Sequence, residues 1–195
     1  MKKKILILAM GAIFIAILAS GTVAFFTADD QAHNIITTGA VDISIEEWQA
    51  TADGLVPYPQ DKPIHVMPAT TVSKIVTVRN TDADAYIRAK YEIIVMDADG
   101  KVMQISPEKL DSVITISVNG SEWQRKDGDS EWWYYTEEVA AGDATEPLFT
   151  SIVFDGPNMT NEYQNCTVEI VVKAQAVQTA NNGDDAFEAA GWPKE

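Results

Sequence analysis

The sequence predicts an all-β protein: an antiparallel β-sandwich of the jelly-roll or Greek-key type, with about eight strands and short helical turns. Apolar and polar residues alternate with a period of two, as in Val41 to Glu46, which is typical of strands with one buried face. Short segments rich in Gly, Asn and Asp separate the apolar runs, as expected at turns. Beyond the N-terminus no long stretch has helical periodicity, which favours two packed antiparallel sheets.

Eight segments carry the strand pattern. The expected strands are 41–46, 72–78, 85–95, 113–118, a short strand at Trp123, 132–135, 148–154 and 166–177. In the last one, every second residue from Cys166 to Ala176 is apolar and points the same way. The segment 47–63 contains three prolines, which cannot donate ladder hydrogen bonds, so it is expected to be a loop or a protected edge.

Three local signals predict turns and short helices between these strands. Asn119-Gly120 is a two-residue hairpin signal that would return the chain through Trp123. Ser106 and Pro107 fit the N-cap and first position of a helical turn. The alanine-rich segment from Asp184 to Trp192 has the propensity for a short C-terminal helix.

The N-terminus has the pattern of an export signal. Three lysines precede an apolar run from Ile5 to Ala19, and small residues follow up to Ala24. We expect cleavage between Ala24 and Phe25, because the apolar run is shorter than the roughly 20 residues that span a membrane. An uncleaved anchor is the alternative. The expected organisation is a signal peptide (1–24), an N-terminal segment (25–39) and a sandwich domain (40–195).

The net charge and the composition limit the classes of molecule that the chain is expected to bind. The chain of 195 residues has 29 acidic and 14 basic residues, a net charge of −15, and it is 46% hydrophobic. It is therefore a globular protein that repels phosphate backbones and anionic lipid surfaces. We expect no nucleic-acid partner, and membrane contact only through the signal peptide before cleavage.

The sequence contains no recognisable catalytic or cofactor motif. Its two histidines, His33 and His65, form no HExxH motif, and no GxSxG occurs. Cys166 is the single cysteine, so no intrachain disulfide can form. It shares the apolar face of its strand, which predicts a buried, unreactive thiol. We expect no enzymatic activity, no cofactor and no metal site.

Two further segments have competing interpretations. Asp97 to Gly100 is similar to the start of a calcium loop, but an EF-hand glycine is missing at the sixth position, where Val102 stands, so a plain turn is favoured. The aromatic run from Trp132 to Tyr135 fits a sugar-stacking platform or core packing, and core packing is favoured. Alternation puts Trp132 and Tyr134 on one face, so one aromatic pair must lie outside the core or beneath a loop.

Several segments together resemble the TasA/camelysin (CalY) family of Gram-positive bacteria, whose members are exported by a signal peptidase of the SipW type. The export junction is the most specific of them, and the others occur in the expected order. The matching segments are 21–27, 38–43, 76–81, 85–88, 132–135 and 146–150. The resemblance implies a secreted jelly-roll sandwich that, in some members, polymerises into biofilm-matrix fibres. The metalloprotease activity ascribed to some members is not expected, because this chain lacks a zinc motif.

An assembly hypothesis follows from the physics of sheet edges. A sandwich with a poorly covered edge can accept a strand from another subunit, and the segment freed by cleavage is the natural donor. A head-to-tail contact that does not close gives a filament. Even-numbered and odd-numbered positions form two faces, and either can enter the groove. The candidate donor residues are Phe25, Phe26, Ala28, Ala32, Ile35 and Ile36.

Three functional hypotheses remain. The first is a secreted, self-assembling matrix protein whose main partner is a second copy of itself, with an accessory matrix or anchoring protein left open. The second is a monomeric secreted or cell-surface module that binds a glycan or cell-wall polymer. A secreted hydrolase with an unrecognised site is a distant third. Alternatively, the N-terminal segment folds back as the first strand of its own chain, which leaves a monomer.

Overall fold

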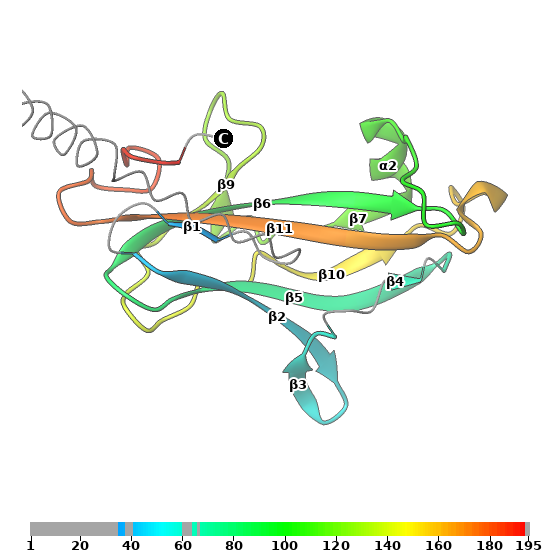
Figure 1. Cartoon of the computed structure of the whole chain (residues 1–195), viewed down its shortest axis with the longest axis horizontal. Helices are drawn as coiled ribbons and strands as arrows, with labels where there is room; N and C mark the ends of the chain where they lie inside the picture. The colour runs from blue at the N-terminus through cyan, green and yellow to red at the C-terminus, as the bar shows by residue number, and fades with distance from the viewer. Residues whose placement is uncertain (1–34, 38–40, 60–63, 66, 194–195) are drawn as a thin grey trace, which may run out of the picture. The chain divides into compact units, whose positions relative to one another are not determined.

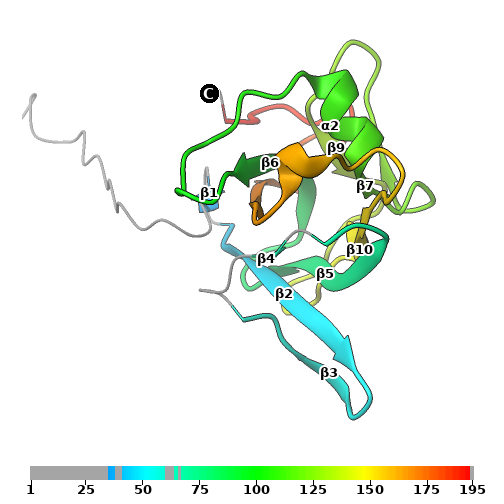
Figure 2. The same cartoon turned by 90° about the vertical axis from the view of Figure 1, so that its right-hand side faces the viewer.

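The computed structural model describes residues 35–37, 41–59, 64–65 and 67–193. These residues belong to one compact unit, Ala32–Glu195. They form two β-sheets packed face to face, so the predicted all-β sandwich is confirmed (Figures 1 and 2). The predicted signal peptide and the junction between Ala24 and Phe25 lie outside the described residues.

Sheet A has the strand order β1-β11-β6-β9-β8, and β4 also pairs with β11. All of its described pairs are antiparallel except β1 with β11, which is parallel. Its strands are β1 (Ile35–Thr37), β4 (Ile64–His65), β6 (Ala85–Met96), β8 (Trp123–Gln124), β9 (Trp133–Tyr135) and β11 (Thr167–Gln178).

Sheet B is fully antiparallel, with the order β3-β2-β5-β10-β7. The β2–β3 hairpin extends away from the two layers (Figure 1). The strands are β2 (Ile43–Thr51), β3 (Gly54–Pro57), β5 (Thr70–Asn80), β7 (Ile114–Ile116) and β10 (Phe149–Phe154).

The core lies between the sheets and follows the predicted alternation. Val168, Ile170 and Val172 of β11 point inward and are at most 7% exposed. They face inward residues of sheet B such as Val76 and Val78, which are fully buried. Alternating apolar side chains on two facing sheets are what closes such a sandwich.

Helical structure is short. The helix α2 (Pro107–Val113) has Pro107 at its first position, as predicted, although the Ser106 side chain makes no capping hydrogen bond. A 3₁₀ turn, η1 (Asn161–Tyr163), precedes β11. Over the described ranges, no helix has the length and apolarity needed to cross a membrane.

Four sequence predictions need correction. The described residues form eleven strands rather than about eight. The prediction of a loop or protected edge for 47–63 is correct for β3, which is the edge strand of sheet B, but wrong for residues 47–51, which continue β2. The hairpin at Asn119-Gly120 is wrong, because β7 pairs with β10 in sheet B while Trp123 pairs with β9 in sheet A. The turn there accepts hydrogen bonds at Asn119 O and carries the chain between the sheets.

The fourth correction is the C-terminal helix. Residues 184–193 form turns and extended chain rather than a helix. Asp185 accepts hydrogen bonds from the amides of Phe187 and Glu188, and the Asn182 side chain accepts from Ala190 N. The Asp185 contacts cap a single turn, closed by a hydrogen bond from Ala189 N to Asp185 O. The turn does not continue, because Ala190 N donates to the Asn182 side chain instead of to a preceding carbonyl.

Candidate functional site

The two edges of β6 are covered very differently. On one side β6 pairs with β11 along twelve residues. On the other side it pairs with β9 only at Arg88 and Ala89, and isolated bridges join Ala85 to Val139 and Met96 to Val102. Among the described strands, none covers this second edge between Ala89 and Val95.

The main-chain groups that face this bare edge can be identified. Ala85 exchanges hydrogen bonds with Val139, and Val95 O accepts one from Met103 N, so odd-numbered residues of β6 point towards this side. Because the direction alternates along an antiparallel strand, Tyr91 and Ile93 point the same way. Their N–H and C=O groups form an unpaired strand edge, which is a template for another strand.

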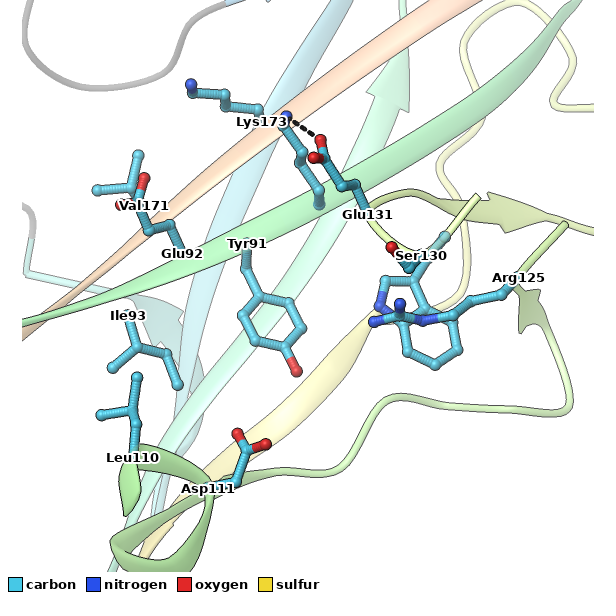
Figure 3. Close-up of a pocket in the computed structure, with 12 residues that line it drawn as sticks. Tyr91, Glu92, Ile93, Leu110, Asp111, Arg125, Ser130, Glu131, Val171 and Lys173 are labelled. Carbon is cyan, nitrogen blue, oxygen red and sulfur yellow. Dashed lines mark hydrogen bonds and ion pairs between the residues drawn. The ribbon is translucent and has the colours of Figure 1, made fainter. Parts of the chain in front are cut away.

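A recess lies along this edge, between β6, α2 and the segment that joins β8 to β9 (Figure 3). Its volume is about 450 Å³. Ile93 and Leu110 supply an apolar wall, and the Tyr91 hydroxyl points into the space near Asp111 and Arg125 (Figure 3). We call this feature the edge recess.

The segment before β9 explains why the sheet stops here. The Asp129 carboxylate accepts hydrogen bonds from the amides of Glu131 and Trp132, at 3.0 and 3.1 Å, and from the Tyr134 hydroxyl at 2.9 Å. This turn directs the chain away from β6, so β9 cannot continue opposite Tyr91. Burial alone would raise the pKa of Asp129, but the three hydrogen bonds outweigh it and lower that pKa.

Charged groups around the edge recess balance one another. Lys90 lies opposite Lys173 in the strand register and makes an ion pair with Glu131 at 3.2 Å. Arg125 stacks over the Trp133 ring at 4.4 Å. The three basic groups face three carboxylates, which belong to Glu92, Glu131 and Asp111. On a chain with a net charge of −15, the edge recess is thus locally neutral.

Beyond the edge recess, the same face of sheet A is covered by the C-terminal segment. Arg88 lies between the rings of Trp132 and Trp192, at 4.4 and 4.7 Å. Its guanidinium donates to Gln175 Oε1, to the Tyr134 hydroxyl and to the Pro193 carbonyl. We call this the Arg88 cluster. A buried cation held by hydrogen bonds and ring faces is a stabilising arrangement.

The Arg88 cluster resolves the open question about the aromatic run. Trp132 and Tyr134 lie on the outer face beneath the C-terminal segment, packed with Ala186 and Trp192. Trp133 and Tyr135 face the main core. The prediction that one pair lies beneath a neighbouring segment is confirmed. The covered pair does not form an exposed platform for a sugar.

The candidate donor residues are only partly described. Ala24, Phe25, Phe26, Ala28 and Ala32 lie outside the described residues. Ile35 and Ile36 belong to β1, which pairs in parallel with Ala174 and Gln175 of the same chain.

Cys166 occupies the predicted position. It is 1% exposed, and its Sγ lies 3.5 Å from both Met103 Sδ and the Glu162 carbonyl. Burial raises the pKa of the thiol, which lowers the thiolate fraction. The predicted turn at Asp97 to Gly100 is confirmed by a hydrogen bond from Gly100 N to Asp97 O. The described part of the chain holds no group of three or more His, Cys, Asp or Glu residues that could bind a metal ion.

Sequence reasoning missed two features. The bare edge of β6 has no sequence signal, because the alternating pattern continues through Lys90 to Val95 without change. The second is a buried ion pair between Lys74 and Glu47, 2.7 Å apart. Burial lowers the pKa of Lys74 more than Glu47 raises it. The sequence does indicate that Lys74 is buried, because it lies on the same face of β5 as Val76 and Val78.

The chain matches no family model, no curated protein and no solved structure.

Proposed function

We propose that the chain is a secreted structural protein that assembles head to tail into extracellular fibres by donating its N-terminal segment to a neighbouring subunit. The observation that carries this proposal is the position of β1. Ile35–Thr37 form a three-residue strand at the edge of sheet A, beside β11, and they follow the N-terminal segment directly in the sequence.

The described main-chain pairing of β1 with its own subunit is short. It pairs in parallel with Ala174, Gln175 and Ala176 only. Between β1 and β4, the edge of β11 from Glu169 to Lys173 has no partner among the described strands. A sandwich with a short peripheral strand and uncovered edges is suited to strand addition between subunits.

Export is supported by the N-terminal pattern. Three lysines, an apolar run and the small residues up to Ala24 fit a cleaved signal peptide. Cleavage would free Phe25 from the membrane-bound signal, so assembly would follow export. The resemblance to the TasA/camelysin family agrees with this order of events and with a matrix fibre as the product.

A second candidate is a monomeric secreted or cell-surface module that binds a glycan or cell-wall polymer. The edge recess favours it, since Tyr91 and Trp133 line a space of about 450 Å³ beside polar groups. Against it, Arg125 already stacks on the Trp133 ring, and Trp132 and Tyr134 are covered. The structural role is therefore preferred.

The test is assembly of the secreted chain, followed by negative-stain electron microscopy and sedimentation. The unaltered chain should form filaments. A chain that lacks Phe25–Asn34 should remain soluble and keep its β-sheet circular dichroism, because a donor segment completes the sheet of a neighbouring subunit rather than the core of its own.

Two outcomes would contradict the proposal. Filaments of normal length and number from the shortened chain would exclude the segment as donor. A monomeric unaltered chain at all concentrations, together with unfolding of the shortened one, would favour an intrachain first strand and the binding-module alternative.

A further inference from the structure

We infer that the outer face of sheet B carries a binding site for an extended, uncharged polysaccharide. The site lies on the half of this face next to the β2–β3 hairpin (Figure 1). The inference goes beyond the proposed function and does not depend on fibre formation. We call this surface the uncharged face. Its main residues are Trp48, Leu55, Thr71, Ser73, Ile75 and Val153.

The strand register places Trp48 and Ile75 at the centre of this surface. Ile45 and Val78 lie opposite each other and are buried between the two sheets. Trp48 and Ile75 also lie opposite each other, and each is three residues from that buried pair. Because successive side chains of a strand point to opposite faces, Trp48 and Ile75 point outward.

The uncharged face continues over the neighbouring strands. On the hairpin, Leu55 lies opposite Ala50, whose amide donates to the Ser73 hydroxyl at 3.0 Å. On β10, Val153 lies opposite Thr71. Sheet B has five strands, and the four gaps between them span about 19 Å, at ~4.8 Å each. A chain that crosses these strands can therefore place several sugar rings on the face.

The absence of charge indicates the kind of polymer that binds. None of the described outward strand positions on this half carries an ionisable group, although 22% of the residues of the chain are charged. The other half of the same face differs, because Glu46 and Arg79 form an ion pair there. The net charge of −15 repels acidic polysaccharides, nucleic acids and a second copy of the chain. A neutral polymer meets no such repulsion.

The side chains of the uncharged face match the two kinds of group on a hexose ring. The C–H faces of the ring are apolar and pack on an aromatic ring. Trp48 is half-buried, and Pro57 and Ile75 are its cross-strand neighbours. The hydroxyls of the sugar need donors and acceptors beside this ring. The Ser73 hydroxyl oxygen accepts a main-chain amide and its O–H can donate, and Thr71 is exposed.

A partner protein or a lipid surface fits this face less well. The centres of protein interfaces are rich in aromatic residues and arginine. Among its described outward positions, the uncharged face has a single aromatic ring, that of Trp48, and no arginine. Helices and segments that bind anionic lipid carry basic residues beside their apolar side, and this face has none. Its hydroxyl groups and single indole therefore favour a polysaccharide.

The first arm of the test measures binding to the full secreted chain by isothermal titration calorimetry. Cellohexaose is the probe, because it is an extended, uncharged chain of hexoses. Hexagalacturonate is the matched acidic control. Cellohexaose should bind, and hexagalacturonate should bind at least tenfold more weakly, because its carboxylates are repelled by the acidic chain.

The second arm locates the site. Val153→Glu places a carboxylate on the uncharged face, and Trp48→Ala removes its aromatic ring. Each should weaken the binding of cellohexaose at least tenfold. The matched control is Val102→Glu, because Val102 is 50% exposed and Val153 is 39% exposed. A second control, Arg125→Ala, changes the edge recess. Both controls should bind cellohexaose as the unaltered chain does.

Circular dichroism of each variant separates loss of the site from loss of the fold. Trp48→Ala removes the cross-strand contacts of a half-buried ring, so it also lowers stability. If this variant unfolds, Val153→Glu and Thr71→Glu decide the result, because both side chains are exposed and their replacement leaves the core intact.

Four results would overturn the inference. The first is no binding of cellohexaose, and the second is equal binding of hexagalacturonate. The third is weaker binding by Arg125→Ala with normal binding by Val153→Glu, which would move the polysaccharide to the edge recess. The fourth is a Val153→Glu chain that binds cellohexaose normally but loses a self-association seen by sedimentation, which would make a second copy the occupant. A chain that binds cellohexaose at this face but forms no filaments supports this inference and contradicts the proposed function.

Discussion

The two halves of β6 differ in what covers them. From Ala85 to Ala89, every residue is buried on both faces of sheet A. From Lys90 to Met96, only Val95 is buried, and β11 is the one strand that pairs along the whole stretch among the described residues. We call these the covered half and the open half.

Two basic residues on the same face illustrate the difference. Arg88 is 8% exposed and makes hydrogen bonds to three residues between two indole rings. Lys90, two residues further, pairs with Glu131, whose side chain is 66% exposed. The described part of the C-terminal segment covers Arg88 and contacts its guanidinium, so this strand has one end enclosed by hydrogen bonds and rings and one end with a more exposed ion pair.

The largest effect is expected from Arg88→Met in the covered half. It leaves the buried Gln175 Oε1 and the partly buried Pro193 carbonyl without this donor, and we expect the free energy of unfolding to fall by about 3 kcal/mol. Urea denaturation measures it. Arg88→Lys should recover little, because an ammonium group cannot replace the planar fork.

Lys90→Met is the matched control in the open half. Lys90 makes an ion pair with an exposed partner and lies 4.8 Å from the centroid of the Trp132 ring. Because contacts of this kind contribute about 0–1 kcal/mol each, the loss should be smaller than that of Arg88→Met. Equal losses for Arg88→Met and Lys90→Met would show that the two halves do not differ in the way the structure indicates.

The second-largest loss of stability is expected from a change in the C-terminal segment that covers Arg88. Trp192→Ala removes the ring that stacks on Arg88 and contacts Tyr134 at 5.7 Å between centroids, so we expect a loss of about 2 kcal/mol. Trp192→Phe should change stability by less than about 0.5 kcal/mol, because the indole N–H is buried without a partner. A large loss from the phenylalanine variant would mean that this N–H has a partner in solution.

A smaller, pH-dependent effect is expected at Asp129, whose turn separates the two halves. Its pKa is lowered in the folded protein, so its carboxylate stabilises the fold above the ordinary value of 3.8. That stability is lost as the pH falls through the lowered pKa. Asp129→Asn should cost about 1 kcal/mol at pH 7, and the difference from the unaltered protein should shrink below pH 4. A difference that stays constant from pH 7 to pH 3 would contradict this assignment.

The alternating pattern predicts the residues between the two sheets better than it predicts the cover of the outer faces or the pairing at the sheet edges. It correctly places Val168 to Ala176 of β11 inward. It gives no warning that Gln175 and Val177, on the opposite face, are also buried. The cause is the C-terminal segment, whose position depends on side-chain contacts of Asn182 and Asp185 rather than on any periodicity.

The candidate site was less predictable for a related reason. The sequence Asp127-Gly128-Asp129 is typical of a turn, but it does not indicate how the turn affects the length of β9. The start of β9 depends on the hydrogen bonds that the Asp129 carboxylate accepts from the amides of Glu131 and Trp132. The sequence pattern does not show these bonds. A pattern that reports burial on each face carries no information about which edge of a strand stays without a partner.

The last prediction needs no substitution and tests the comparison at single amides. Tyr91 and Ile93 N–H point to the bare edge, whereas the amides of Lys90 and Glu92 point to β11. In hydrogen exchange of the subunit before assembly, Tyr91 and Ile93 should exchange with opening free energies near zero, and their neighbours near the global value. In the covered half, Ala85 and Ala89 should be protected as well, because both face a partner across that edge. Protection of these two amides in the isolated subunit would mean that another part of the chain already occupies the edge.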